Sequence, residues 1–84
     1  MLPNAFRWIE WNLEHATRHG CTISEIESVV RRPARGYPRK IGDGKWLVEG
    51  RGVGGRMMRV VYLMGGDDRA FVIHAMPLTT RRRR

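Results

Sequence analysis

Three short apolar runs in the second half of the chain constrain its fold more than any other feature. The runs cover residues 45–50, 57–64 and 70–76 and are rich in Val, Ile, Trp, Tyr and Phe. The glycine-rich segments GRGVGG and GGDD separate them. Short runs of β-branched and aromatic residues between glycine turns are typical of antiparallel hairpins. The pattern therefore predicts three consecutive strands of one sheet.

The first half of the chain is expected to form two helices. The first covers residues 12–20, where Gly20 suits a left-handed C-terminal cap. This helix either follows a short edge strand at residues 6–8 or runs back to a cap at Asn4. Its apolar side chains recur at helical spacing: Ile9, Leu13 and Ala16.

The second helix is expected to begin at Thr22 or Ser24, which are both good N-cap residues, and to end at Pro33. Glu25 and Glu27 fall in its first turn, near the positive end of the helix dipole. The predicted apolar stripe consists of Ile23, Ile26, Val29 and Val30.

An irregular edge strand at residues 37–41 and a turn at Asp43-Gly44 are expected to precede the three runs. The fold class is then α+β, with two N-terminal helices packed on a three- to four-stranded antiparallel sheet. The 84 residues allow one domain, because a chain of this size buries only about 60% of its unfolded surface. The expected division is 1–8 as an arm or short strand, 9–32 as the two helices, 36–76 as the sheet and 77–84 as a basic tail.

The chain is strongly basic, since sixteen Lys and Arg oppose eight Asp and Glu for a net charge of +8. Only two of these basic residues are lysines. A planar guanidinium binds phosphate through two donors and stacks on bases, so the composition predicts binding to RNA or DNA. A genome that favours arginine codons would produce the same excess, but the positive field exists in either case.

No cofactor or metal site is predicted. Cys21 is the only cysteine, which excludes an intrachain disulfide and a cysteine-based zinc site. His15 and His19 are one helical turn apart but lack the Glu of H-E-x-x-H and a fourth ligand, so they are interpreted as a solvated pair, with His19 near the helix C-terminus. The G-x-G-x-x-G spacing in GRGVGG leads into a strand, whereas the dinucleotide motif requires a helix. With no signal-peptide pattern and no apolar run of about 20 residues, a cytoplasmic protein that does not enter the membrane is expected.

Each of the three runs places a charged or titratable side chain among apolar neighbours. Alternation puts Glu49 with Lys45 and Leu47, Arg59 with Val61 and Leu63, and His74 with Val72 and Met76. Metal-free RNA cleavage requires a base, an acid and cations that stabilise the phosphorane charge. His74 or Glu49 is the candidate base or acid, and the candidate phosphate ligands are Arg51, Arg56 and Arg59.

A structural interpretation of the same residues competes with this one. Glu49 would form a cross-strand ion pair with Arg59 or Arg51, and His74 would be a core residue with satisfied hydrogen bonds. Trp46, Tyr62 and Phe71 are expected in the core, although an exposed ring beside arginines would stack on bases. The candidate nucleic-acid-binding residues are Lys45, Arg39, Lys40, Arg81, Arg82, Arg83 and Arg84.

Four segments in order, HGCTISEIESVV, DGKWLVEGR, GRMMRVVY and FVIHAMPLT, resemble the BrnT-like toxins of bacterial type II toxin–antitoxin modules. Related small domains of unknown function share much of the pattern. The resemblance extends from about Trp8 to Thr79. Its motifs are His19-Gly20, Thr22 to Glu25, Gly50-Arg51, and Gly55-Arg56 followed by Val60, Val61 and Tyr62.

The resemblance implies a RelE-like ribonuclease fold, endonucleolytic cleavage of mRNA, and inhibition by a cognate antitoxin that represses the shared operon. The chain would act as a homodimer or in a toxin–antitoxin hetero-oligomer. Two features depart from the family: His74-Ala75-Met76 replaces a common Ser-Ala-Arg, and only RRRR remains of the helix that usually follows Thr79. A non-catalytic module of the same fold, which binds nucleic acid or a partner protein, is the alternative.

Overall fold

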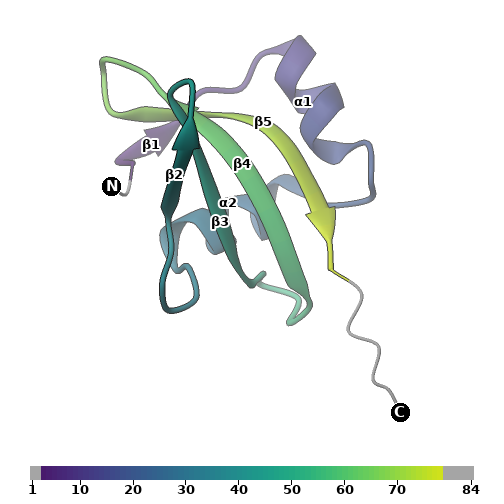
Figure 1. The fold of residues 1–84 in the computed structure, drawn as a ribbon. Coiled ribbons are helices and arrows are strands. Elements are labelled where there is room, and N and C mark those ends of the chain that lie inside the picture. The colour runs from purple at the N-terminus through teal and green to yellow at the C-terminus, as the bar shows by residue number, and fades with distance from the viewer. Residues whose placement is uncertain (1–2, 79–84) are drawn as a thin grey trace.

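The three apolar runs form neighbouring strands of one sheet, and both expected helices are present (Figure 1). The computed structural model describes residues 3–78. Its elements are β1 (Ala5–Phe6), α1 (Glu10–Thr17), α2 (Ile23–Arg31), β2 (Arg39–Gly42), β3 (Lys45–Arg51), β4 (Met57–Met64) and β5 (Arg69–Pro77). Residues 79–84, with the predicted tail contacts Arg81 to Arg84, lie outside the described part.

The sheet has five strands in the order β1-β5-β4-β3-β2, and it is mixed. Four strands pair antiparallel, but β1 pairs parallel to β5 through Ala5 opposite Arg69 and Phe6 opposite Ala70. The α+β class is confirmed, whereas the prediction of three or four antiparallel strands is wrong. The short edge strand offered at residues 6–8 is present as β1, and its parallel pairing with the edge of β5 adds the fifth strand.

The β2–β3 hairpin forms at the predicted turn. Asp43 and Gly44 have φ values of 52° and 73°, as a two-residue type I′ turn requires at both central positions. Asp tolerates this conformation and Gly adopts it without strain. The hairpin holds β2 at the edge of the sheet, where Arg39 lies opposite Leu47.

Helix α1 begins after the short strand β1, so the start at an Asn4 cap is wrong. Asn12 closes its first turn: the side-chain oxygen accepts from the Ile9 N–H at 2.7 Å, and the amide donates to the Arg7 carbonyl at 3.0 Å. Only Asn12 and Ala16 of this helix are buried, while Ile9 and Leu13 are exposed. The predicted stripe is therefore correct only at Ala16, because α1 contacts β5 along a narrow line at i and i+4.

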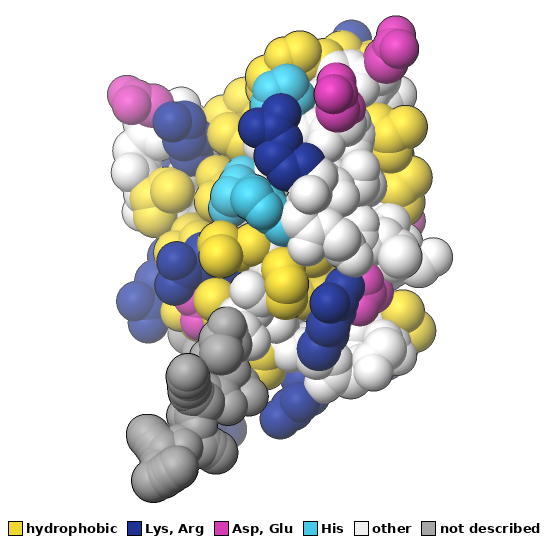
Figure 2. Space-filling view, turned by 90° about the vertical axis from the view of Figure 1, so that its right-hand side faces the viewer, with side chains coloured by type: hydrophobic (Ala, Val, Ile, Leu, Met, Phe, Trp, Pro, Cys, Tyr) yellow, Lys and Arg dark blue, Asp and Glu magenta, His cyan; other side chains and the backbone are white. Residues whose placement is uncertain are grey.

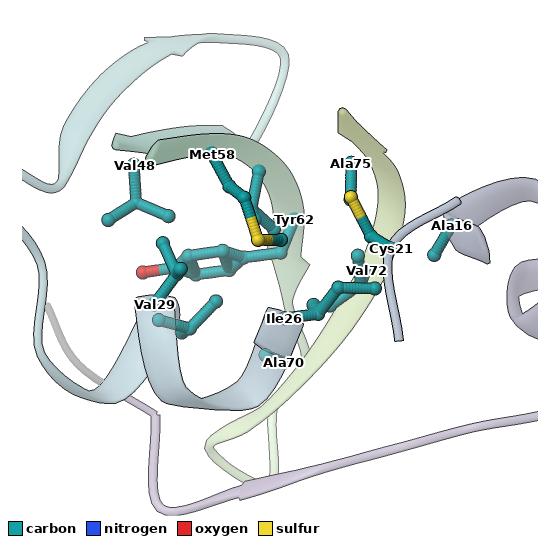
Figure 3. Packing of buried hydrophobic residues seen from close by; sticks show 12 residues of the cluster. Ala16, Cys21, Ile26, Val29, Val48, Met58, Tyr62, Ala70, Val72 and Ala75 are labelled. Carbon is teal, nitrogen blue, oxygen red and sulfur yellow. The ribbon is translucent and has the colours of Figure 1, made fainter. Parts of the chain in front are cut away.

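Helix α2 covers one face of the sheet. It is capped by Thr22, packs on β3 and β4, and buries most of its predicted stripe, although Ile23 remains partly exposed. In Figure 1, α2 passes behind these strands, and neither described helix crosses their near side. The core lies between α2 and the sheet (Figure 3) and consists of Ala16, Cys21, Ile26, Val29, Val30, Val48, Met58, Val60, Tyr62, Ala70, Val72 and Ala75.

A bulge in β5 decides where His74 points. Tyr62 lies opposite Val72, but Val61 lies opposite His74, so Ile73 is an extra residue in β5. Val72 faces the core and is fully buried, whereas His74 joins the half-buried Val61 on the other face. The expectation that His74 shares a face with Val72 is wrong for this reason, and its grouping with Met76 is correct. Neither helix in the described residues has the length and apolar character needed to cross a membrane.

Candidate functional site

The sheet face turned away from α2, here called the open face, brings the predicted ionic residues together. Strand register fixes the arrangement in rows across the sheet. His74 lies in one row, and Glu49 and Arg59 lie in the next. The rows are Arg39, Leu47, Val61 and His74; then Glu49, Arg59 and Met76; and on the other side Lys45, Leu63 and Phe71.

Glu49 and Arg59 form a cross-strand ion pair. Both Nη2 and Nε of Arg59 donate to Oε2 of Glu49, at 2.8 Å and 3.0 Å. The Arg59 side chain is 44% exposed and the Glu49 side chain 18%. The structural alternative for Glu49 is thus correct in geometry, with Arg59 as the partner. Exposed ion pairs contribute only about 0–1 kcal/mol, so the stability of the fold depends little on this pair.

His74 is half-buried beside a second histidine. The ring of His19 meets the ring of His74 edge-on, with 5.5 Å between centroids and 69° between planes. Burial lowers the pKa of His74, and the charges of His19 and Arg59 lower it further. Each of these effects disfavours the imidazolium. The shift favours the neutral imidazole of His74, which is the form that accepts a proton.

Helix α1 forms a wall at the β5 side of the open face. Trp11, His15 and His19 recur at i, i+4 and i+8, with His19 just past the helix end. The Trp11 ring stacks on His15 at 3.9 Å and 21°, and it lies parallel to Phe71 at 6.2 Å and 10°. Nδ1 of His15 is hydrogen-bonded to the Trp11 carbonyl at 2.8 Å. The wall thus consists of aromatic and imidazole rings that face β5.

All three histidines of the chain meet on this side of the molecule. Figure 2 shows their side chains among hydrophobic and basic neighbours. The sequence interpretation treated His15 and His19 as a solvated pair and missed the contact of His19 with His74 on β5 and the stacking of His15 on Trp11. The spacing of Trp11, His15 and His19 was the available signal. Within residues 3–78, no group of three or more His, Cys, Asp or Glu side chains could hold a metal ion.

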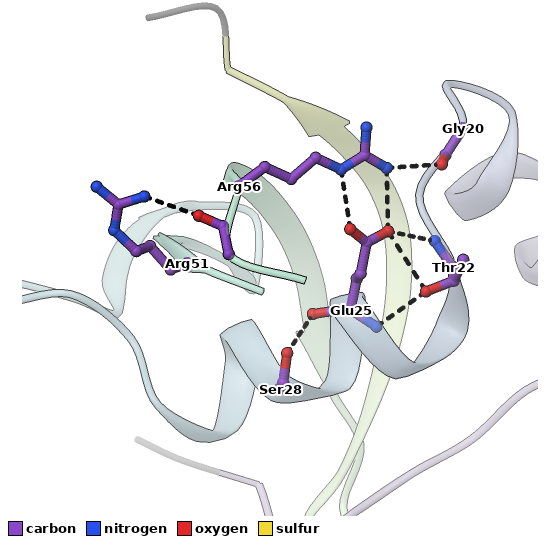
Figure 4. Close-up of polar contacts among 7 residues, drawn as sticks. Gly20, Thr22, Glu25, Ser28, Arg51 and Arg56 are labelled. Atoms are coloured by element: carbon purple, nitrogen blue, oxygen red, sulfur yellow. Dashed lines mark hydrogen bonds and ion pairs between the residues drawn. The ribbon is translucent and has the colours of Figure 1, made fainter. Parts of the chain in front are cut away.

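Arg56 belongs to a different place, on the side of α2 (Figure 4). Its Nε and Nη2 donate to the two carboxylate oxygens of Glu25 at 2.8 Å and 3.0 Å, and Nη2 also donates to the Gly20 carbonyl at 2.8 Å. Glu25 in turn accepts from the Thr22 N–H at 3.0 Å. We call these four residues, Gly20, Thr22, Glu25 and Arg56, the clamp.

The clamp joins the α1–α2 turn to the start of β4. Hydrogen bonds from Arg56 and then from the Thr22 backbone lower the pKa of Glu25 to about 2. Most of the motifs that carry the family resemblance lie in or next to this clamp, including His19-Gly20, Thr22 to Glu25 and Gly55-Arg56. They hold the fold together, and the structure does not bring Arg56 to the open face.

Arg51 is also directed elsewhere. Its Nη1 donates to the Gly55 carbonyl at 2.7 Å. Its side chain lines a surface groove of about 510 Å³ between α2 and the β3–β4 loop. The groove is lined by Ser24, Glu27, Ser28, Arg31, Arg32, Arg51, Gly52 and Val53. Arg51 therefore does not join the set formed by Glu49, Arg59 and His74.

The predicted nucleic-acid contacts divide in the same way. Arg39 lies in the row of His74 and Lys45 in the row of Phe71. Lys40 lies opposite Trp46 and over its ring at 6.0 Å, in register with the buried Tyr62 and so on the face that packs against α2. Tyr62 and Trp46 pack in or against the core as expected, but Phe71 lies on the open face.

Comparison with known proteins gives no relative for this chain. Its sequence matches no protein-family model and no curated protein, and its fold matches no solved structure. The function therefore has to be inferred from the geometry of the open face.

Proposed function

We propose that the chain is a metal-independent endoribonuclease that cleaves mRNA on its open face, as the toxin of a type II toxin–antitoxin module similar to the BrnT-like toxins. One observation supports this proposal above the others. The half-buried His74, whose pKa is lowered by burial and by the charges of His19 and Arg59, lies in contact with His19 on a face that no described helix covers. These are the group types that phosphodiester cleavage without a metal requires.

In the proposed reaction, the neutral imidazole of His74 accepts the proton of a ribose 2′-hydroxyl. The 2′-oxygen attacks phosphorus, and the bond from phosphorus to the 5′-oxygen breaks. His19 is the proposed general acid and donates the proton that the leaving 5′-oxygen requires. The products are a 2′,3′-cyclic phosphate and a 5′-hydroxyl, and proton exchange with water restores both histidines.

Arg59 stabilises the charge that develops on the phosphoryl oxygens. Its side chain is partly exposed and held by Glu49 through two hydrogen bonds to one oxygen. Glu49, on the neighbouring strand β3, thus fixes the position of the guanidinium on the open face, and this assigns Glu49 a positioning role in place of proton transfer. Arg39 and Lys45 lie on the same face and supply contacts to neighbouring phosphates.

The test is purified protein on a long mRNA in EDTA, with His74→Ala and Arg59→Ala as site variants. We expect cleavage by the wild type, ends with 2′,3′-cyclic phosphates, and rates lowered about 10²- to 10⁴-fold by His74→Ala and about 10²- to 10³-fold by Arg59→Ala. Arg69→Ala is the matched control, because Arg69 has the same 44% exposure as Arg59 and is also ion-paired, with Asp67.

Two outcomes would contradict the nuclease proposal. The wild type leaves the RNA intact, or the wild type and both site variants cut at equal rates. A loss of activity in Arg69→Ala as large as in Arg59→Ala would show that net charge alone matters, and it would remove the specific role of Arg59.

The alternative is a non-catalytic nucleic-acid-binding module. The Glu49–Arg59 ion pair favours this alternative, because it explains the presence of both charged side chains on the open face without a catalytic role. This module would bind RNA without cutting it, and the slope of log affinity against log salt would shrink by about one for each phosphate-contacting Arg or Lys removed. Replacing Arg39 and Lys45 by Ala, and deleting residues 81–84, measures those slopes separately.

The proposed partner is a cognate antitoxin. Induced expression of the chain alone should arrest growth, and expression together with the adjacent reading frame should restore it. The variant His74→Ala should be harmless in both conditions. Arrest that persists in His74→Ala would separate toxicity from RNA cleavage.

A further inference from the structure

The open face contains an aromatic surface that the proposed reaction does not use. Of the three tryptophans in the chain, Trp8 and Trp46 pack against the core, whereas Trp11 is 49% exposed. Single exposed apolar residues such as Ile9 and Leu13 need no special explanation. Trp11 differs from them because its ring packs nearly parallel to two other rings, those of His15 and Phe71, and still remains half exposed.

Trp11, His15 and Phe71 form what we call the ring stack. His15 lies on Trp11 with 3.9 Å between centroids, and Phe71 lies parallel to Trp11 at 6.2 Å. The hydrogen bond from His15 to the Trp11 carbonyl fixes the imidazole. Because the rings are already ordered, a planar ligand that joins the stack would lose little protein conformational entropy on binding.

The ring stack lies directly beside the catalytic histidine. Phe71 and His74 face the same side of β5, opposite Leu63 and Val61 of β4. Leu63 and Val61 are two residues apart on β4, which corresponds to about 7 Å. Phe71 and His74 lie opposite them, so the ring stack and the imidazole of His74 occupy adjacent positions on the open face. His19, which contacts His74, lies just past the end of α1, four residues after His15.

A cation accompanies the rings. The guanidinium of Arg7 lies over the Phe71 ring, 5.4 Å from its centroid, and its side chain is exposed. An exposed aromatic surface next to a guanidinium offers a base and its phosphate what each requires, since bases stack on rings and arginine binds phosphate. A base inside a duplex is unavailable for such stacking, which selects single strands.

We propose that the ring stack is a subsite for one unpaired base of single-stranded RNA, next to the scissile phosphate, with Arg7 on the adjoining phosphate. This inference rests on the proposed nuclease function for the identity of the neighbouring site. The base-stacking part is independent of cleavage.

The experiment measures binding to a strand that cannot be cut. The probe is a fluorescent 2′-O-methyl oligoribonucleotide without secondary structure, used alone and annealed to its complement, with affinity read by fluorescence anisotropy at fixed salt. Trp11→Ala removes the ring, Trp11→Phe retains an aromatic surface, and Leu13→Ala is the matched control because Leu13 is an exposed apolar residue on the same helix. Thermal unfolding of each variant confirms that it is folded.

We expect Trp11→Ala to weaken single-strand binding about 5- to 100-fold, the loss of one base–aromatic stack. Duplex binding should stay within about twofold, as expected where contacts are to phosphates only. Trp11→Phe should retain most of the single-strand affinity, and Leu13→Ala all of it. An abasic nucleotide at one position of the probe should weaken wild-type binding and leave Trp11→Ala unchanged.

Unchanged single-strand affinity in Trp11→Ala would overturn the inference while leaving an active nuclease intact. Equal weakening toward single strand and duplex would overturn it as well, because the ring would then have no preference for unpaired bases. A change of oligomeric state in Trp11→Ala, measured by light scattering, would assign the ring to a protein contact instead. If the wild type does not cleave RNA but Trp11→Ala alone loses single-strand affinity, the base subsite stands and the nuclease proposal fails.

Discussion

Two Glu–Arg pairs of this protein have nearly the same contact distance and different surroundings. In the clamp, Arg56 meets Glu25 at 2.8 Å, and on the open face Arg59 meets Glu49 at 2.8 Å. The two guanidinium side chains are almost equally exposed, at 45% and 44%. The carboxylates differ: Glu25 accepts bonds from both Arg56 and Thr22, whereas the hydrogen bonds to Glu49 come from Arg59 through one oxygen.

The Glu25–Arg56 pair stabilises the fold, whereas the Glu49–Arg59 pair leaves an arginine available for a ligand. Glu25 is tied into a helix cap and its partner also holds the Gly20 carbonyl, so breaking the pair leaves several groups without partners. The Glu49–Arg59 pair joins two strands that are already paired along their length. The fold therefore depends little on this pair, and the partly exposed Arg59 guanidinium is available to an anionic ligand while Glu49 holds it.

The largest difference between the two ion pairs is expected in stability when each carboxylate is removed. Glu25→Ala should lower the free energy of unfolding by about 2 kcal/mol, because charged hydrogen bonds and a helix cap are lost together. Glu49→Ala should cost less than about 1 kcal/mol, as expected for an exposed cross-strand pair. Denaturant unfolding monitored by circular dichroism measures both values. Equal destabilisation by the two variants would remove the distinction between clamp and open face.

The rate of RNA cleavage should be affected in the opposite order, more by Glu49→Ala than by Glu25→Ala. Glu25→Ala should cut RNA at the wild-type rate per folded molecule, while Glu49→Ala should be slower because Arg59 loses the group that orients it. Glu49→Gln retains one hydrogen-bond acceptor and should recover part of the rate. A rate for Glu25→Ala lower than that for Glu49→Ala would place the clamp in the reaction.

The pH dependence of stability should show a smaller effect of the Glu25–Arg56 pair. The pKa of Glu25 is lowered from 4.5 to about 2 in the folded protein. A depressed carboxyl pKa gives stability that is fully present above the unfolded value and is lost as pH falls toward the folded value. The wild type should therefore lose this contribution between about pH 4.5 and pH 2, and Glu25→Gln should show a flatter decline of melting temperature over that range. Parallel declines for the two proteins would show that Glu25 is not the group responsible.

Local signals made most of the secondary structure predictable. The Asp43-Gly44 turn, the Thr22 cap with Glu25 and the three apolar runs each depend on residues within a few positions of one another, and all were recognised. The features that the sequence pattern did not predict depend on contacts between residues far apart in the chain. The short N-terminal strand was one of two alternatives in the sequence, and its parallel pairing with β5 could not be predicted; the exposure of Ile9 depends on how α1 meets β5.

The candidate site was predictable in part for the same reason. Glu49 and Arg59 were brought together by the hairpin that the glycine loop already indicated. His74 reached the same face only through the bulge at Ile73, which has no sequence signature here. Arg56 was assigned to the site because the sequence pattern could not show its ion pair with Glu25, which lies 31 positions away in the chain. Sequence distance hid the clamp, and the pairing of His19 with His74 was hidden in the same way.

The smallest expected effect concerns the charge next to His74. Arg59 contributes to the lowered pKa of His74, after burial and after His19. Removing that positive charge in Arg59→Met should raise the pKa of His74 slightly, because the imidazolium is then less disfavoured. Arg56→Met should leave it unchanged, since Arg56 lies in the clamp and not on the open face. Proton NMR of the imidazole Cε1–H signals, titrated through the neutral range, measures the pKa in each variant. If Arg56→Met shifted His74 as much as Arg59→Met, the two regions would be electrostatically coupled, and the separation of a structural pair from a ligand-binding pair would fail.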